Sequence, residues 1–195
     1  MILDTLGNID IYLLDQIMKN RYAPNETILD AGCGTGRNIY WFYTNGFNVH
    51  AIDNNPERID YIKTIYPAQK ENFKVASLAN IPYSDNSINH IINCAVLHFV
   101  NSTQQFKLYF SELVRVLKPN GSLFIRMTSD IGIENFITPL QNGVYALPDG
   151  TNRFLLTREL INELLTEFPI ALLEPIKSTN VQDLRTMSTL VFTKN

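Results

Sequence analysis

Short apolar runs alternate with longer amphipathic stretches along this chain of 195 residues. The short runs predict strands, and the stretches in which apolar residues recur every three or four positions predict helices. The predicted strands cover residues 27–30, 47–53, 73–76, 88–94, 122–127, 172–179 and 186–193. The predicted helices cover residues 7–21 and 38–43, a segment that begins at Pro56, a segment capped by Ser102 that stops at 118–121, and residues 157–168.

Strands that alternate with helices predict a doubly wound, mostly parallel sheet, because parallel neighbours need a long crossover that a helix supplies. We therefore expect one α/β domain over residues 1–195. The last two strands are rich in β-branched residues, which suits an antiparallel pair at the edge of the sheet. Residues 1–22 are predicted to cap the sheet with a helix. Residues 129–153 hold prolines and glycines without a clean period, and are predicted to be a lid or a substrate-binding insertion.

Charge and hydropathy exclude several classes of protein. Sixteen basic and nineteen acidic residues give a net charge of -3, and the basic residues are scattered, which disfavours a nucleic-acid partner. Residues 1–10 lack the basic start of a signal peptide, and the most apolar segment, 88–100, is shorter than the roughly 20 residues of a membrane span. We expect a cytoplasmic protein without a membrane partner. Cys33 and Cys94 have no metal-ligand spacing, so no metal site is predicted, and the sequence leaves their pairing open.

A glycine-rich stretch and an acidic residue carry the first indication of function. The stretch AGCGTG follows the first predicted strand and leads into a helix, where glycines permit a tight turn and a close approach of the main chain to a ligand. Asp53 ends the second strand, 21 residues after Gly32, near the spacing at which a carboxylate binds the hydroxyls of an adenosine ribose. Both features lie at carboxyl ends of strands, where such sheets bind ligands. Together they predict a nucleoside-like ligand.

The loop alone leaves the kind of nucleoside-like ligand open. Arg37 stands where the dinucleotide fingerprint has its third glycine, and no Walker loop is present, so a pyrophosphate ligand is disfavoured. An oxidoreductase that uses NAD is therefore only a runner-up hypothesis for an enzyme. A non-catalytic module that binds a nucleoside is a further hypothesis.

Four motifs in order resemble the motif set of the class I methyltransferases that depend on S-adenosylmethionine: ILDAGCGTGRN, VHAIDNNP, IPYSDNSINHIINCAVLHFV and LVRVLKPNGSLFI. The resemblance covers about residues 27–127 and looks most like the small bacterial type. It implies a Rossmann-like sheet of seven strands in the order 3-2-1-4-5-7-6, with S-adenosylmethionine as the cofactor. It also implies a small-molecule methyl acceptor and a monomer or homodimer. The fourth strand ends in NCAV, which disfavours the substrates of the amino-methylating DNA and glutamine enzymes.

The resemblance also implies which residues bind the cofactor. The glycine loop would wrap the methionine part, Asp53 would hold the ribose, and Asn54 with the backbone near Ser77 would flank the adenine. Many relatives carry Asp at the position of Ser77, so the adenine contact there is expected to be weaker. The implied set is Tyr12, Asp30, Ala31, Gly32, Gly34, Gly36, Arg37, Asp53, Asn54, Ser77, Leu78, Asn93, Cys94 and Ala95.

The residues that act on the acceptor are less clearly marked. Transfer of a methyl group depends mainly on alignment and exclusion of water, and a base helps where the acceptor loses a proton. His98, just beyond the fourth strand, is the candidate base, with a packed structural histidine as the alternative. Tyr145, Arg153 and Phe154 are candidates for acceptor specificity, or residues that fasten the insertion. Phe42 and its neighbour Trp41 are predicted to lie in the core.

Overall fold

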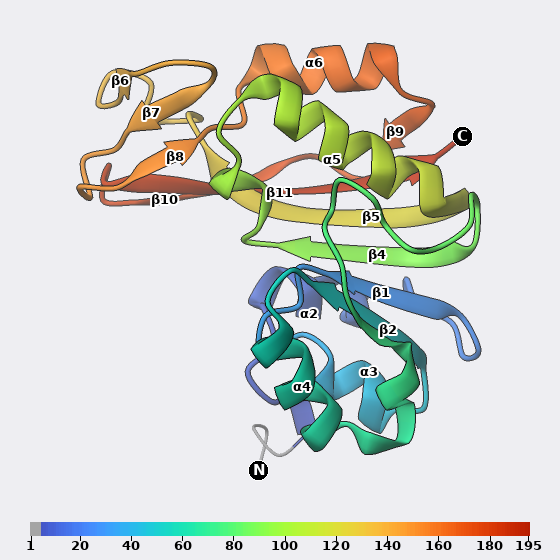
Figure 1. Ribbon diagram of the computed structural model, residues 1–195. Coiled ribbons are helices and arrows are strands. Elements are labelled where there is room, and N and C mark those ends of the chain that lie inside the picture. Colours follow the sequence, from blue (N-terminus) through green and yellow to red (C-terminus); the bar gives the residue numbers. More distant parts are fainter. Residues whose placement is uncertain (1–4) are drawn as a thin grey trace.

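The computed structural model describes residues 5–195 and contains a central twisted sheet covered by helices on both faces (Figure 1). The sheet order is β10-β11-β5-β4-β1-β2-β3, with β9 added to β11. Its strands are β1 (Thr27–Ala31), β2 (Asn48–Asp53), β3 (Phe73–Val75), β4 (Ile88–Cys94), β5 (Leu117–Ser129), β9 (Ile170–Leu172), β10 (Lys177–Val181) and β11 (Arg185–Lys194). The strands from β3 to β5 are parallel, and β11 is antiparallel to its neighbours. The predicted class and strand order are confirmed, with β11 and β10 in the places of the seventh and sixth strands.

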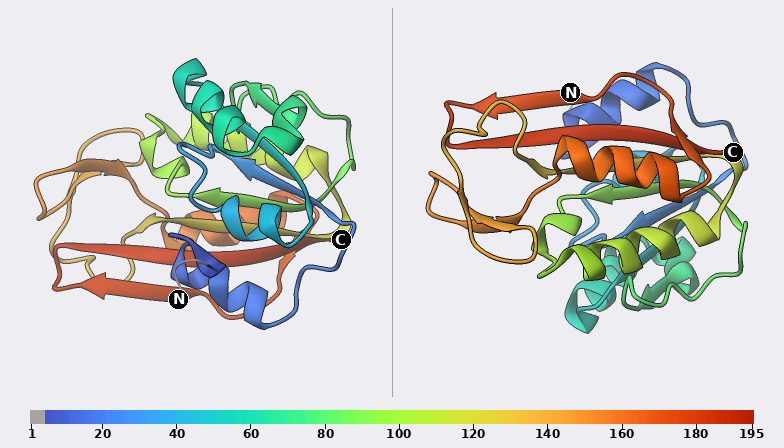
Figure 2. Two further views of the ribbon diagram at one scale, coloured as in Figure 1. Left: turned by 90° about the horizontal axis from the view of Figure 1, so that it is seen from below. Right: turned by 90° about the horizontal axis from the view of Figure 1, so that it is seen from above.

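The helices form two layers, and each layer packs on its own apolar cluster (Figures 1 and 2). On one face lie α5 (Thr103–Val116) and α6 (Arg158–Glu167), whose Phe110 and Leu164 are buried against the sheet. On the other face lie α2 (Ile11–Met18), α3 (Tyr40–Thr44) and α4 (Pro56–Ile65). Two short 3-10 helices, η1 (Pro67–Asn72) and η2 (Leu97–Phe99), follow α4 and β4 along the chain. Phe42 is fully buried as predicted, whereas Trp41 is partly buried beside it.

Several predicted boundaries are corrected by the structure. The predicted strand 172–179 is two strands, β9 and β10, that both pair with β11, so the described sheet has eight strands instead of seven. Pro175 lies between them and has no N–H to donate to the ladder. The predicted helix 7–21 is shorter, because the Asp10 side chain accepts a hydrogen bond from the Tyr12 N–H and starts α2 at Ile11. Residues 1–4 of the predicted cap lie outside the described residues.

The segment 129–153 is not an irregular loop. It contains β6 (Thr138–Pro139) and β7 (Val144–Ala146), and β7 pairs with both β6 and β8 (Asn152–Phe154) in a small antiparallel sheet. This small sheet extends past the end of the central sheet at which β4 and β1 finish (Figure 1). None of the helices formed by residues 5–195 has the length and apolarity that crossing a membrane requires.

Candidate functional site

Two cavities open at the carboxyl ends of the parallel strands. The first, named here the glycine-loop cavity, has a volume of about 340 Å³, within the range of small-molecule sites. Its walls come from the ends of β1, β2, β3 and β4 and from the start of α5. The lining residues are Gly32, Ile52, Asp53, Asn54, Arg58, Ala76, Ser77, Leu78, Ala95, Val96, Phe99, Val100, Gln105 and Tyr109.

Main-chain hydrogen bonds hold the glycine loop against the end of β2. The N–H groups of Gly32 and Cys33 both donate to the carbonyl of Ile52, at 2.8 and 3.0 Å. Gly32 has φ +85°, and a Cβ at this position would lie 2.5 Å from Cγ2 of Val96. Only glycine therefore allows the loop to pass this close to the end of β4.

Asp53 is fixed by the main chain and faces the cavity. Its Oδ2 accepts from the Gly34 N–H at 2.9 Å, and its Oδ1 accepts from the Asn55 N–H at 2.9 Å. The Arg58 guanidinium lies 3.7 Å from Oδ2. A carboxylate has about four acceptor positions, so this pre-oriented side chain can accept further hydrogen bonds from a ligand.

Two buried oxygen atoms near the glycine loop have no hydrogen-bond partner among the described residues. They are Oδ2 of Asp30, at the end of β1, and Oδ1 of Asn93, in β4. Asn93 is held by its Nδ2, which donates to the carbonyl of Ala31 at 2.8 Å. Burial raises the pKa of the Asp30 carboxyl to about 7. Unpaired buried oxygens are rare in folded proteins, and here both are suited to accept hydrogen bonds from a ligand.

Ala95 forms a common wall between this cavity and a second one. It follows β4 with φ +60°, a left-handed conformation that is uncommon for residues other than glycine. Its N–H donates to the carbonyl of Arg126 at 2.7 Å, which holds the turn in place. Strained residues of this kind cluster at functional sites.

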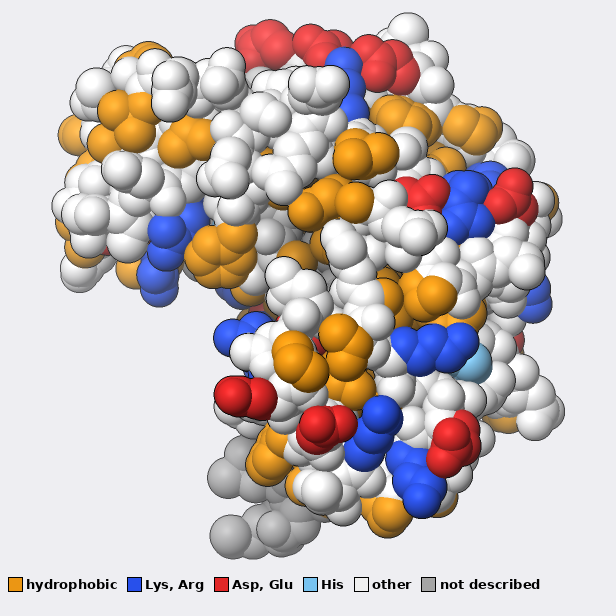
Figure 3. Space-filling view, in the orientation of Figure 1, with side chains coloured by type: hydrophobic (Ala, Val, Ile, Leu, Met, Phe, Trp, Pro, Cys, Tyr) orange, Lys and Arg blue, Asp and Glu red, His pale blue; other side chains and the backbone are white. Residues whose placement is uncertain are grey.

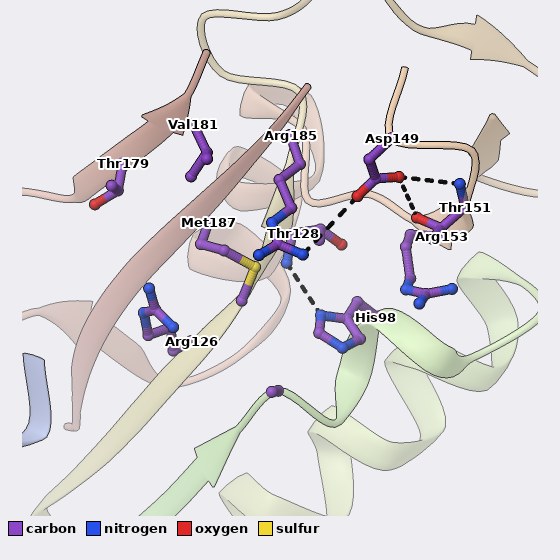
Figure 4. Close-up of a pocket in the computed structure, with 11 residues that line it drawn as sticks. His98, Arg126, Thr128, Asp149, Thr151, Arg153, Thr179, Val181, Arg185 and Met187 are labelled. Carbon is purple, nitrogen blue, oxygen red and sulfur yellow. Dashed lines mark hydrogen bonds and ion pairs between the residues drawn. The ribbon is translucent and has the colours of Figure 1, made fainter. Parts of the chain in front are cut away.

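The second cavity, named here the arginine cavity, has a volume of about 280 Å³ and lies under the small sheet. Figure 4 shows its side chains, which come from η2, β5, β10, β11 and the 129–153 segment. The lining residues are Ala95, His98, Arg126, Thr128, Asp149, Thr151, Arg153, Thr179, Val181, Arg185 and Met187. In the space-filling view the molecule is hollowed below the small sheet, and basic and apolar side chains border the hollow (Figure 3).

His98 is a buried and neutral member of the arginine cavity. Its Nδ1 accepts a hydrogen bond from the Thr128 N–H at 3.3 Å, so the neutral ring carries its proton on Nε2. Burial, and then the nearby cations of Arg153, Arg126 and Arg185, lower the pKa of His98 to about 4. A neutral imidazole with a hydrogen on Nε2 can donate a hydrogen bond to a ligand. The assignment of His98 as a base stays a prediction.

Replacing His98 is expected to change how stability depends on pH. Because its pKa is lower in the folded state than in the unfolded state, the unfolded state takes up a proton first as the pH falls. The wild type should therefore lose about 3 kcal/mol more than His98→Gln between pH 7.5 and pH 4. Chemical denaturation at a series of pH values measures this difference, and parallel pH profiles for the two proteins would contradict it.

The structure gathers part of the predicted cofactor set around the glycine-loop cavity. Six predicted residues line it: Gly32, Asp53, Asn54, Ser77, Leu78 and Ala95. The Ser77 hydroxyl accepts from the Ala79 N–H at 3.1 Å. Gly34, Asp30, Ala31 and Asn93 adjoin this group through the contacts described above. Gly36 packs under the loop instead, where its carbonyl accepts from the Tyr66 hydroxyl at 3.0 Å.

Three other predicted residues lie around Asp10, on the side of the arginine cavity. Arg37 Nη2 is 3.3 Å from Asp10 Oδ2 and 3.3 Å from the Cys94 sulfur. Burial raises the pKa of the Cys94 thiol to about 12, and both cysteines are free thiols. The Tyr12 hydroxyl hydrogen-bonds the Thr179 hydroxyl, and its ring lies under the Arg126 guanidinium. Their roles toward a cofactor stay predictions.

Within the insertion, the candidate residues separate into two groups. Phe154 is buried and stacks on Phe106 with ring centroids 5.1 Å apart, so it fastens the segment to α5. Arg153 faces the arginine cavity, whereas Tyr145 is half-buried in β7. Whether the segment moves as a lid stays a prediction.

Several residues that line the cavities carry no functional signal in the sequence. Arg126 and Arg185 lie in strands, where the sequence shows ordinary alternation. Gln105 adjoins the cap, since its N–H donates to the Ser102 hydroxyl at 3.1 Å and its Oε1 accepts from the Asn101 N–H at 2.8 Å. The same side chain lines the glycine-loop cavity, where its Nε2 donates to the Tyr109 hydroxyl at 3.0 Å. In the sequence, Gln105 and Tyr109 are related only by their spacing of four residues, which places them on the same face of α5.

Comparison with known proteins identifies the same region. The model of a family described as "Methyltransferase domain" matches residues 29–125, which contain both the glycine loop and Asp53. An O-methyltransferase of Dictyostelium discoideum is 28% identical over 169 residues, which cover 76% of this chain and 37% of that protein. A thiol S-methyltransferase of Rattus norvegicus is 33% identical over 117 residues, which cover 57% of this chain and 47% of that protein. The chain thus spans less than half the length of these two relatives.

Solved structures share the whole fold. The crystal structure of an S-adenosylmethionine-dependent methyltransferase from Clostridium acetobutylicum superposes with a TM-score of 0.74. The superposition covers 100% of this chain and 96% of that one, at 15% sequence identity. At this sequence identity, the structural similarity shows a shared fold and not a shared function.

Proposed function

Because this chain belongs to the class I methyltransferases that depend on S-adenosylmethionine, we propose that it transfers the methyl group of this cofactor to a small-molecule acceptor. The observation that carries the proposal is the pair of cavities that meet at Ala95. One has the carboxylate and the glycine loop suited to a nucleoside, and the other offers a separate space for an acceptor. A transfer reaction needs both ligands to meet at one point.

The residues of the glycine-loop cavity fit the cofactor. Asp53 would accept hydrogen bonds from the two ribose hydroxyls, while Leu78 and the main chain at Ser77 would lie against the adenine. The unpaired oxygens of Asp30 and Asn93 would accept from the ammonium group of the methionine part. A cationic partner at this place also favours the charged form of the Asp30 carboxyl.

The cofactor supplies, when bound, a methyl group on a positively charged sulfur that leaves as a neutral thioether. The chain's contribution is to align the two ligands at Ala95 and to exclude water from the point of transfer. His98 Nε2 can donate a hydrogen bond to an acceptor held in the arginine cavity. Relatives act on oxygen and on sulfur, so the acceptor atom is not set by the family alone.

Calorimetric titration with S-adenosylhomocysteine tests the proposal. We expect saturable binding at one site per chain, and no comparable heat with NADH. Binding of NADH with no binding of S-adenosylhomocysteine would favour the oxidoreductase hypothesis instead. A protein that binds S-adenosylhomocysteine but transfers no methyl group to a broad panel of small acceptors would favour the non-catalytic binding module.

A further inference from the structure

The arginine cavity carries an excess of positive charge in its lining. Arg126, Arg153 and Arg185 reach it from three different strands, and Asp149 is the acidic side chain among its lining residues (Figure 4). Asp149 is already engaged, since its Oδ1 accepts from the N–H and the hydroxyl of Thr151 at 3.0 and 2.6 Å. Its Oδ2 lies 3.9 Å from Nη1 of Arg185, which is a weak ion pair at most. The lining residues therefore include three guanidinium groups and one carboxylate.

Asp10 partly balances the charge at the inner end of this cavity. Nη1 of Arg126 and Nη2 of Arg37 lie 3.2 and 3.3 Å from the same oxygen, Oδ2 of Asp10. Two guanidinium groups therefore share one carboxylate, and the buried Nε of Arg126 has no acceptor among the described residues. A positive charge remains at this end after Asp10 is counted.

Most N–H donors of the Arg153 and Arg185 guanidinium groups, which line the cavity, are available to a ligand. Nη1 of Arg153 donates to the neighbouring carbonyl of Asn152 at 2.7 Å, and its guanidinium carbon lies 5.0 Å from the centre of the Phe99 ring. The Arg185 side chain is 54% exposed and has the distant Asp149 as its partner. Each guanidinium has five N–H donors in a planar fork that matches the oxygens of a carboxylate or a phosphate.

We propose that the arginine cavity binds the anionic group, a carboxylate or a phosphate, of a small organic methyl acceptor. This inference rests on the proposed function, and it names the class of acceptor. The volume of about 280 Å³ lies just below the usual range for ligand pockets, which favours a small molecule. Arg153 and Arg185 donate hydrogen bonds to the anionic group, while Val181 and Met187 contact the organic part of the acceptor. The accepting atom then lies toward Ala95 and the glycine-loop cavity.

Fluorine NMR with three matched probes tests this proposal in the presence of saturating S-adenosylhomocysteine. The probes are 4-fluorobenzoate, its neutral isostere 4-fluorobenzamide, and 4-fluorophenyl phosphate. At least one anion should bind at least tenfold more tightly than the amide, and the comparison of the two anions distinguishes carboxylate from phosphate recognition. Equal binding of all three probes would overturn the proposal.

Variants of the exposed arginines locate the binding. The double variant Arg153→Gln/Arg185→Gln should reduce anion affinity to the level of the amide, whereas Arg185→Lys should retain part of it, because the charge stays and the fork is lost. Arg158→Gln on α6, which lines a different cavity, is the matched control and should bind the anions like the wild type. Unchanged anion binding in the double variant would overturn the proposal.

Two separate titrations, one with the anionic probes alone and one with S-adenosylhomocysteine alone, distinguish this inference from the proposed function. The affinity of the double variant for S-adenosylhomocysteine should stay within twofold of the wild type, because neither arginine lines the glycine-loop cavity. Anion binding without any binding of S-adenosylhomocysteine would contradict the proposed function and leave the anion site standing. Binding of S-adenosylhomocysteine without a preference for anions would contradict the anion site alone.

Discussion

Asp53→Ala is expected to weaken the binding of S-adenosylhomocysteine by at least about 100-fold. Each hydrogen bond to a charged group contributes about 1.5 to 3 kcal/mol, and two ribose hydroxyls would bond to this carboxylate, so a loss of about 3 kcal/mol is a conservative value. The substitution also frees the Gly34 and Asn55 N–H groups that Asp53 now holds, which loosens the glycine loop. Calorimetry on the wild type and the variant measures the change directly.

Two matched variants distinguish the carboxylate from a general effect of mutation. Asp60→Ala removes an exposed carboxylate from α4 and should leave the affinity unchanged. Asp53→Asn keeps the shape and one acceptor oxygen but loses the charge, and should bind with intermediate affinity. Equal affinity of Asp53→Ala and the wild type would show that the cofactor does not contact this residue.

Gly32→Ala is expected to destabilise the fold by about 3 kcal/mol, which corresponds to a fall in Tm of roughly 10 °C for a domain of this size. The new Cβ would lie 2.5 Å from Cγ2 and 2.9 Å from Cγ1 of Val96, so rotation of one methyl group does not relieve the contact. The left-handed φ of +85° adds about 1 to 2 kcal/mol for any residue with a Cβ. Thermal unfolding followed by circular dichroism measures the change.

Gly34→Ala is the control for this effect, because it makes the same substitution in the same loop. Gly34 also has a left-handed φ, of +54°, but a Cβ there has no atom within 4 Å. Its Tm should fall by about 3 to 7 °C, the effect of the backbone strain alone. Adding Val96→Ala to Gly32→Ala should recover part of the lost stability. Equal losses for Gly32→Ala and Gly34→Ala would contradict the packing explanation.

The sequence was most informative where one physical requirement determines the residue type. Ser102 and Pro56 start helices in the structure as they do in the prediction, because capping and a preset φ act locally. The apolar run 88–94 predicted a central strand, since a parallel strand is covered on both faces. The glycine loop and Asp53 could be placed together because each ends its own strand.

The arginine cavity could not be predicted in this way. Arg126 looks like an ordinary polar position of a strand, and Arg185 lies just before the predicted strand 186–193. Arg153 is a candidate for acceptor specificity in the 129–153 segment, but all three are far apart in the chain and nothing local joins them. They meet because β11 pairs with β5 and the small sheet extends past the end of the central sheet. The split of residues 172–179 into β9 and β10 was missed for a related reason, since both pair with the long strand β11, and this pairing is not local.

The central claim is that the cofactor lies in the glycine-loop cavity with its sulfur toward Ala95. A crystal structure of the protein with S-adenosylhomocysteine tests this claim most directly. We expect both ribose hydroxyls within hydrogen-bonding distance of Asp53, and the sulfur facing the arginine cavity across Ala95. A ligand bound elsewhere, or one whose ribose turns away from Asp53, would contradict it.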